Sequence, residues 1–256
     1  MQFQNKTVII TGGGTGIGRK AAALFYNEGA NVIINGRREE VLKTTATETD
    51  PTEQKVSFVA GDISNPETSK ELVNKAVDLF GGVDILVNNT GKFVPTPFTE
   101  YTPEDVQSYL DVIVKGTLFT SQAVIPEMKK RGQGAIINTG SMWALQPVEA
   151  TPSAAYSAAM AGRHAMTKNM AVELAADNIR VNAVAPAVVE TPIYNNFLSD
   201  EEVPEVLDSF NEFHPLKRNG QPEDVANAIL FLASESASWI TGTVMPIDGG
   251  ATARLR

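Results

Sequence analysis

Two hydroxyl-bearing side chains, Ser141 and Tyr156, are placed where they could act together in proton chemistry. Ser141 comes directly after the apolar run AIINTG, and Tyr156 lies fifteen positions later in an Ala-rich helical stretch over 153–176. A serine hydroxyl can hold a carbonyl oxygen, and a tyrosine phenol can give or take a proton. The alternative is a capped strand end and an ordinary helix tyrosine. Their joint position at the carboxyl edge of a predicted sheet favours a functional role.

A glycine-rich stretch near the start of the chain is typical of a nucleotide-binding turn. The sequence predicts a strand, a helix and a second strand over 7–35, with Gly12, Gly16 and Gly18 at the first turn. Glycines there permit a tight turn and close approach of a ligand, and the following helix directs free N–H groups at a phosphate. The spacing is GxxxGxG rather than GxGxxG. A purely structural turn is the alternative, but the complete βαβ unit favours dinucleotide binding.

The end of the second predicted strand indicates which dinucleotide is bound. A carboxylate there would bond the ribose hydroxyls and favour NAD(H). The chain instead has Arg37 and Arg38 after Gly36, with no acid before Glu39. A guanidinium offers a planar set of donors that suits a 2′-phosphate. The two arginines could also be solvated loop charges, but the pattern favours NADP(H) over NAD(H).

Further polar residues follow the later predicted strands. Asp62 comes after the third strand, where it could reach an adenine amino group or cap a helix that begins near Pro66. Asn89 and Gly91 follow the fourth strand, whose continuous apolar run suits burial on both faces. Because open α/β sheets bind ligands at the carboxyl ends of their strands, we expect these residues to gather at one site.

Strand-like and helix-like segments alternate through all 256 residues without a linker or a repeat. This alternation predicts a single α/β domain over 1–256, with a doubly wound parallel sheet in three layers, α/β/α. Residues 104–130 are expected to form one long helix, mildly interrupted by Gly116. The polar and aromatic residues at about 191–215 predict an irregular, mobile segment that covers the substrate.

Composition narrows the possible functions. A net charge of −9 argues against a nucleic-acid partner, and the absence of cysteine excludes disulfides and thiolate chemistry. His164 and His214 have no acidic partner at ligand spacing, so no metal site is expected. No apolar run approaches the roughly 18 residues that a membrane helix needs, and the first residues lack a signal-peptide pattern. We therefore expect a cytoplasmic protein that acts on a small molecule and binds no membrane.

The motifs together resemble the short-chain dehydrogenase/reductase family over essentially the whole chain. The resemblance rests on TGGGTGIG at 11–18, Asp62, NNTG at 88–91, Ser141 with Tyr156, and VNAVAP at 181–186 followed by Thr191. It implies a Rossmann-type fold, a nicotinamide cofactor and hydride transfer between a carbonyl and an alcohol. It also implies a homotetramer, joined through the helix of Tyr156 and the long helix before it. Relatives with Gly-Arg after the second strand, as Gly36-Arg37 here, tend to use NADP.

The resemblance implies cofactor contacts along the whole carboxyl edge of the sheet. They fall on Gly12, Gly14, Thr15, Gly16, Ile17, Gly18, Arg37, Arg38, Asp62, Ile63, Asn89, Gly91, Tyr156, Pro186, Val189 and Thr191.

Of the four catalytic positions that the resemblance implies, the chain keeps Ser141 and Tyr156. Relatives carry a lysine four residues after the tyrosine, whose charge favours tyrosinate, and an asparagine on the long helix that holds a water for proton relay. These positions are Met160 and Ile113 here. Arg163, two helical turns beyond the tyrosine, is not expected to reach the ribose or to replace the lysine.

Two functions remain open on this evidence. The first is an NADP(H)-dependent oxidoreductase acting on a CH–OH or C=O group, with Ser141 orienting the carbonyl and Tyr156 donating the proton. Because reduction needs a protonated tyrosine, loss of the lysine harms that direction less than alcohol oxidation. The second is a catalytically weak or inactive relative that binds the dinucleotide as a sensor or scaffold. Four aromatic residues could line an apolar substrate pocket or simply pack: Phe93, Phe98, Trp143 and Phe197.

Overall fold

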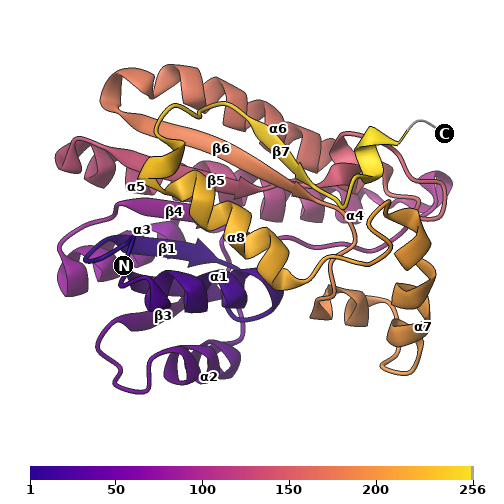
Figure 1. Ribbon diagram of the computed structural model, residues 1–256, viewed down its shortest axis with the longest axis horizontal. Helices are drawn as coiled ribbons and strands as arrows, with labels where there is room; N and C mark the ends of the chain where they lie inside the picture. Colours follow the sequence, from indigo (N-terminus) through magenta and orange to yellow (C-terminus); the bar gives the residue numbers. More distant parts are fainter. Residues whose placement is uncertain (255–256) are drawn as a thin grey trace.

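Seven parallel strands build the central sheet, in the order β3-β2-β1-β4-β5-β6-β7 (Figure 1). The computed structural model describes residues 1–254. Neighbouring strands are parallel throughout, and the chain order reverses at β1 and β4, which confirms the predicted doubly wound α/β fold. The strands are β1 (Thr7–Thr11), β2 (Asn31–Gly36), β3 (Val56–Ala60), β4 (Ile85–Asn88), β5 (Gly134–Thr139), β6 (Ile179–Pro186) and β7 (Val244–Ile247).

Helices cover both faces of the sheet and complete the three layers. One face packs against α1 (Gly16–Asn27), α2 (Glu39–Thr49) and α8 (Pro222–Ala233). The other packs against α3 (Pro66–Phe80), α5 (Gly116–Arg131) and α6 (Ala154–Glu173). Among residues 1–254, none of these helices combines the length and the apolar character that crossing a bilayer requires.

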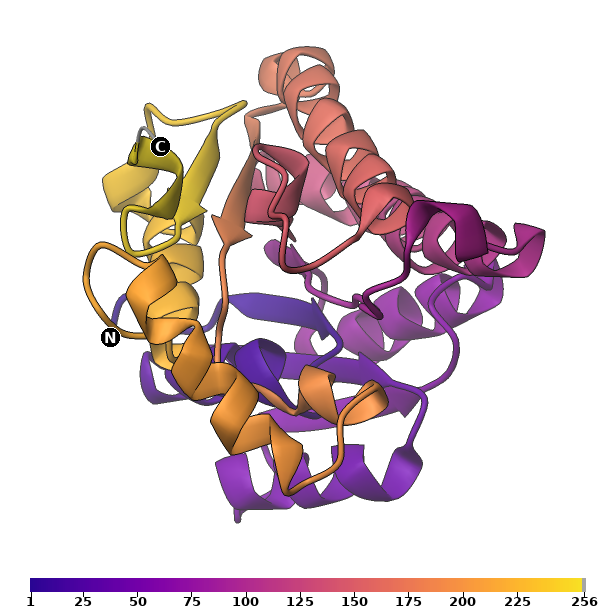
Figure 2. The ribbon, with the colours of Figure 1, turned by 90° about the vertical axis from the view of Figure 1, so that its right-hand side faces the viewer.

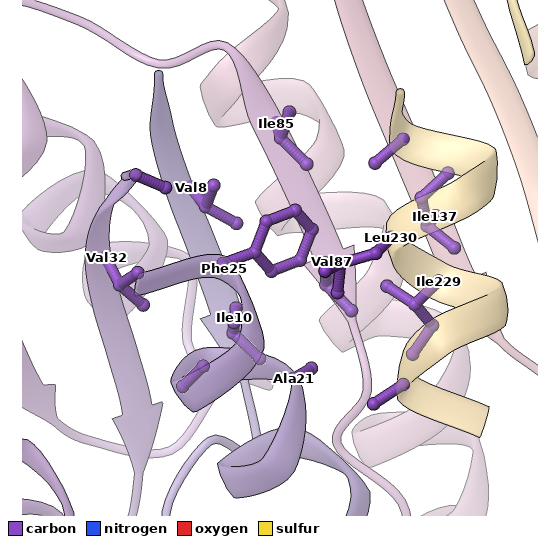
Figure 3. Packing of buried hydrophobic residues seen from close by; sticks show 14 of the residues in the cluster. Val8, Ile10, Ala21, Phe25, Val32, Ile85, Val87, Ile137, Ile229 and Leu230 are labelled. Carbon is purple, nitrogen blue, oxygen red and sulfur yellow. The ribbon is translucent and has the colours of Figure 1, made fainter. Parts of the chain in front are cut away.

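Alternating side chains along β1 divide the core between the two faces. Val8 and Ile10 pack with Phe25 of α1 and Ile229 of α8, as Figure 3 shows, whereas Ile9 belongs to the cluster on the other face. All five side chains are fully buried. Burial of a side chain of this size contributes about 1.5–3 kcal/mol. Apolar β-branched residues on both faces therefore suit a strand that helices cover on both sides.

The long helix expected over 104–130 is divided into three parts. The helix α4 (Pro103–Tyr109) begins at a capping box between Thr102 and Asp105. A π-helical turn follows over Leu110–Lys115, and α5 begins at Gly116. A Cβ at Gly116 would lie 2.8 Å from Cγ2 of Ile63, so this glycine permits close packing. The expected mild interruption is thus a wider turn just before the glycine, and such turns are frequent at functional sites.

The segment over 191–215 lies beyond the carboxyl ends of the strands, and Figure 2, viewed from that end, shows it in front of the sheet. It holds a 3₁₀-helix at Pro192–Asn196, the helix α7 (Glu202–Ser209) and a second 3₁₀-helix at Asn211–Phe213. The prediction of an irregular segment was therefore wrong. Leu207 and Phe210 pack against the apolar cluster that contains Tyr156, and this amphipathic packing supports helical turns.

Candidate active site

A cavity of about 880 Å³ lies at the carboxyl edge of the sheet. Of the sixteen cofactor contacts predicted from the sequence, fifteen line this cavity, as does Ser141. Gly18 is the exception, because it packs inside the turn: a Cβ there would lie 2.2 Å from the carbonyl oxygen of Gly12. The structure therefore brings the predicted residues together in one place, with Gly18 as a packing residue behind them.

The glycine-rich turn has the backbone geometry that a phosphate group requires. Gly12 and Gly16 have φ angles of +65° and +53°, in the left-handed region that favours glycine. Thr15 is the N-cap of α1, and its side chain makes no capping hydrogen bond. The first N–H groups of α1 are thus left without a side-chain cap, and a helix N-terminus of this kind binds anions.

Asn89 and Thr11 hold the glycine-rich turn against the end of β4. The side-chain amide of Asn89 donates to the carbonyl oxygen of Gly12 at 3.2 Å. The hydroxyl oxygen of Thr11 accepts from the backbone N–H groups of Asn89 and Thr90 at 3.0 and 3.1 Å. Thr11 belongs to the TGGGTGIG motif, but its hydrogen bonds to residues 89 and 90 were not predicted, since a threonine that ends a buried strand resembles any other strand residue.

The residues that follow β2 and β3 line one part of the cavity. Arg37 and Arg38 are exposed, line the cavity and form no ion pair within residues 1–254. Asp62 accepts from the backbone N–H and the hydroxyl of Ser64 at 2.9 and 2.7 Å. Asn65, not Asp62, caps α3, so the capping alternative for Asp62 was wrong. Asp62 therefore keeps the role of a cavity residue.

Two buried hydroxyl groups beside the site have no partner within the described part of the chain. These are Oγ1 of Thr90 and Oγ1 of Thr139, and both residues line the cavity. An unpaired buried hydroxyl costs about 1–3 kcal/mol. Such groups fit a polar ligand that satisfies them, and the uncapped α1 fits a phosphate, so the residues present are compatible with a dinucleotide.

Ser141 and Tyr156 are buried and both line the cavity. The Ser141 hydroxyl accepts from the backbone N–H of Trp143 at 3.2 Å, which fixes it just beyond β5. The Tyr156 ring lies in the first turn of α6, with its centroid 4.9 Å from that of Phe93 and 6.0 Å from that of Tyr109. Burial raises the pKa of Tyr156, and the Ser141 hydroxyl and the Arg163 charge oppose that effect. The phenol is thus protonated at neutral pH, as a proton donor must be.

The imidazole ring of His164 holds the backbone of Ser141 by a hydrogen bond. The backbone N–H of Ser141 donates to Nε2 of His164 at 3.3 Å. Burial and the positive charges of Arg163 and Lys168 lower the pKa of His164 to about 4, so the ring is neutral at physiological pH. Within residues 1–254 no group of three or more acidic or histidine side chains is placed to hold a metal ion.

Comparisons with known proteins agree with this geometry. The family model described as enoyl-(acyl carrier protein) reductase matches residues 12–252. A 3-oxoacyl-[acyl-carrier-protein] reductase of Thermotoga maritima is 38% identical over 251 residues, covering 98% of this chain and 99% of the relative. A 3alpha-hydroxysteroid dehydrogenase of Mediterraneibacter gnavus is 37% identical over 256 residues, covering 98% of each. A solved short-chain dehydrogenase/reductase from Caenorhabditis elegans, described as holding cofactor, superposes with a TM-score of 0.94 at 32% identity and covers 100% of this chain and 98% of that one.

The chain belongs to the short-chain dehydrogenase/reductase family. It is thus a hydride-transferring oxidoreductase with a nicotinamide dinucleotide cofactor, as the resemblance implied.

Two positions of this family member differ from the pattern that the resemblance implied. The side chains of Ile113 and Met160 are buried in the apolar cluster that surrounds Tyr156, and Met160 also lines the cavity. Neither side chain carries a charge or can hold a water by a strong hydrogen bond. The lysine and asparagine positions therefore contribute packing here.

Arg163 lies closer to the site than the sequence suggested. Its side chain is 1% exposed and donates to oxygens of four residues, including the backbone carbonyls of Thr139 and Ile113. The expectation that Arg163 does not reach the ribose stays a prediction. Its charge nevertheless acts on Tyr156, because long side chains on a helix point back toward its N-terminus and thus toward Tyr156.

Aromatic residues form the wall of the cavity beside Tyr156. Phe93, Trp143 and Phe197 line it, while Phe98 is 79% exposed and lies outside it. The ring centroids of Phe93 and Phe197 are 5.7 Å apart in an edge-to-face arrangement. Three of the four predicted aromatics therefore border the cavity, and the structure adds Tyr194 and Phe210 to them.

Proposed function

We propose that this protein is a cytoplasmic, homotetrameric NADP(H)-dependent reductase of apolar ketones and a dehydrogenase of the corresponding secondary alcohols. The observation that carries the proposal is the meeting of Ser141 and Tyr156 with the glycine-rich turn in one cavity. The unpaired guanidinium groups of Arg37 and Arg38 support the choice of NADP(H), since a 2′-phosphate would pair with them.

The site residues have separate tasks in the proposed reaction. A bound nicotinamide supplies the hydride for reduction or accepts it for oxidation. The Ser141 hydroxyl donates to the carbonyl oxygen of the substrate and stabilises the negative charge that develops there. The Tyr156 phenol gives its proton to the same oxygen, which leaves an alcohol. In oxidation the Tyr156 phenolate takes that proton back.

The wall around Tyr156 favours an apolar substrate. Phe93, Trp143, Phe197 and Phe210 supply rings, and the indole N–H of Trp143 already donates to Thr151 at 2.6 Å. A sugar would leave several hydroxyls unpaired against such a wall, at about 1–3 kcal/mol each. The steroid dehydrogenase of Mediterraneibacter gnavus shows by its name that a relative of this similarity acts on a large apolar alcohol.

A second candidate is the dinucleotide-binding sensor or scaffold. It is favoured by one observation, the apolar side chains of Ile113 and Met160 at positions where relatives have proton-relay groups. The buried charge of Arg163 near Tyr156 speaks against it, as do the enzyme names of the relatives.

The proposal is tested by NADPH oxidation with a panel of apolar ketones, sugars and charged keto acids. We expect turnover with the apolar ketones and a loss of about 10²–10⁴-fold in Tyr156→Phe, the usual contribution of a positioned acid. Tyr26→Phe is the matched control, because Tyr26 lies in α1 and its hydroxyl bonds Asp50 outside the cavity. Equal turnover in Tyr156→Phe and the wild type would refute the mechanism.

A further inference from the structure

Arg163 is a buried cation without a counter-ion. Its side chain is 1% exposed, and no carboxylate within residues 1–254 forms an ion pair with it. Burying an unpaired charge costs free energy, which neutral hydrogen-bond acceptors offset only in part. A packed apolar side chain at this position would avoid that cost. The presence of a charge here therefore needs an explanation other than packing.

The guanidinium binds oxygens from four segments that meet beside the active site. Nη2 donates to the carbonyl oxygens of Thr90, after β4, and Ile113, in the π-helical turn, at 3.0 and 3.1 Å. Nη1 donates to the carbonyl oxygen of Thr139, at the end of β5, at 2.7 Å. Nε donates to the hydroxyl of Thr117 at 2.8 Å. All four acceptors are neutral, so the positive charge remains uncancelled.

The helix places this charge on the same face as Tyr156. The two residues are seven positions apart on α6, which is two turns and about 10 Å along the axis. The long Arg163 side chain covers part of that distance because it points toward the N-terminus of the helix. Its partner Thr139 precedes Ser141 by two residues, and its partner Thr90 lines the cavity.

We propose that Arg163 is the positioning residue of the proton-transfer site, holding these four segments together and supplying the positive charge that steadies the Tyr156 phenolate in place of a lysine at position 160. This inference rests on the proposed function of Tyr156 as proton donor and acceptor. Burial lowers the pKa of Arg163 only to about 10, so the charge is present at neutral pH. An opposite charge nearby favours the ionised phenol, and the Arg163 charge indeed acts to lower the pKa of Tyr156.

The other titratable groups around Tyr156 do not supply such a charge. His164 is neutral, and Tyr109 and Tyr194 are phenols whose own pKa values burial raises. Lys92 lies 5.4 Å from the ring centroid of Tyr109 and donates to Ser108. In the π-helical turn, Lys115 pairs with Asp111. Three further charges act on neighbouring groups and not on Tyr156: Asp105 on Tyr109, Glu190 on Tyr194 and Lys168 on His164.

The test is a pH titration of the tyrosines by NMR with ring-labelled tyrosine, which needs no turnover. Arg163→Gln removes the charge and keeps hydrogen-bonding groups. We expect the midpoint of Tyr156 to rise by about one pH unit or more, the size of effect that a nearby charge exerts. In the alcohol-oxidation direction, kcat/KM rises with pH because oxidation needs the phenolate. In Arg163→Gln this rise should occur at a pH that is higher by the same amount.

Thr117→Val is the matched control for a purely structural role. It removes one acceptor of Arg163 and leaves the charge, so it should lower the melting temperature without moving the Tyr156 midpoint. An unchanged midpoint in folded Arg163→Gln, or an equal shift in Thr117→Val, would overturn the proposal.

Arg163→Lys decides the question if Arg163→Gln does not fold. Lysine keeps the positive charge but lacks the planar set of donors with which Arg163 binds its four acceptors. We expect the Tyr156 midpoint of this variant to stay within about half a pH unit of the wild type, whereas a rise of about one unit or more, the size expected for loss of a nearby charge, overturns the proposal. Absence of turnover with every substrate would refute the proposed function instead, while the titration still judges the effect of Arg163 on Tyr156.

Discussion

At the scale of single residues, the site depends on hydroxyl groups whose surroundings set their protonation. Ser141 and Tyr156 share one cavity, and burial keeps the phenol protonated for reduction. Arg163 works in the opposite sense and makes the phenolate reachable for oxidation. In the proposed mechanism, the neutral acceptors around the guanidinium leave its charge free to serve both directions of the reaction without a lysine at position 160.

We propose that the preference for NADP(H) depends on Arg37 and Arg38. We expect the double substitution Arg37→Ala/Arg38→Ala to raise KM for NADPH by about 10- to 100-fold, since hydrogen bonds to charged groups contribute about 1.5–3 kcal/mol. KM for NADH should change little, because NADH has no 2′-phosphate. Steady-state kinetics with both cofactors measure the effect, and Arg19→Ala, an exposed arginine outside the cavity, is the control. Equal losses for NADPH and NADH would contradict the assignment.

Sequence patterns predicted the residues that line the cavity better than the residues that hold these lining residues in place. The glycine-rich turn and Asp62 follow strands, and strand ends meet at one edge, so their convergence was predictable. The role of Arg163 was not, because its partners are mainly backbone carbonyls that any residue at positions 90, 113 and 139 would provide. Contacts to backbone oxygens do not constrain the residue type at those positions, so the sequence cannot reveal them.

At the scale of elements, close backbone packing fixes where α1 begins. Gly18 lets the first turn of α1 lie against the carbonyl of Gly12, and Asn89 ties the same carbonyl to the end of β4. Elsewhere the helix before β5 widens into a π-helical turn that presents the carbonyl of Ile113 to Arg163. Local propensity shows the helix in the sequence but not this turn, which depends on tertiary contacts.

A matched pair of helix glycines tests this packing. Gly18→Ala should destabilise the fold by about 3 kcal/mol or more, since the new Cβ would overlap backbone that cannot move aside. Gly162→Ala in α6 should stabilise by about 0.5–1 kcal/mol, because alanine is the better helix former. Its Cβ would make an ordinary 3.6 Å contact with Val114. Urea unfolding measures both, and similar effects for the two substitutions would contradict the packing argument.

At the scale of the whole molecule, the doubly wound sheet brings residues from Gly12 to Phe210 into one cavity. The topology followed from the strand–helix alternation, because crossover connections of this kind yield a parallel sheet. The helical structure within 191–215 did not follow, since short turns over a binding site are stabilised by packing onto it. The fold was therefore predictable where strands and helices alternate regularly. It was not predictable over 191–215, where the structure depends on packing against one cluster of side chains.

The proposed homotetramer is also a property of the whole molecule. Leu118 of α5 is 39% exposed, and the resemblance places a subunit contact on this helix. We expect Leu118→Glu to dissociate the tetramer, because it would bury an unpaired charge. Leu79→Glu, on the exposed end of α3, is the control. Sedimentation velocity distinguishes the two, and a wild type that is monomeric at micromolar concentration would contradict the prediction.

We propose that this family member is a competent enzyme although Met160 and Ile113 replace the lysine and the asparagine. Competence is measured by comparing the wild type with Ile113→Asn/Met160→Lys in NADPH-dependent reduction of an apolar ketone. Because Arg163 already supplies the charge, we predict that the wild type turns over and that the double variant is at most about tenfold faster, which is about 1.4 kcal/mol in barrier. A wild type without turnover, beside a double variant that is active, would contradict the proposed function and support the sensor or scaffold.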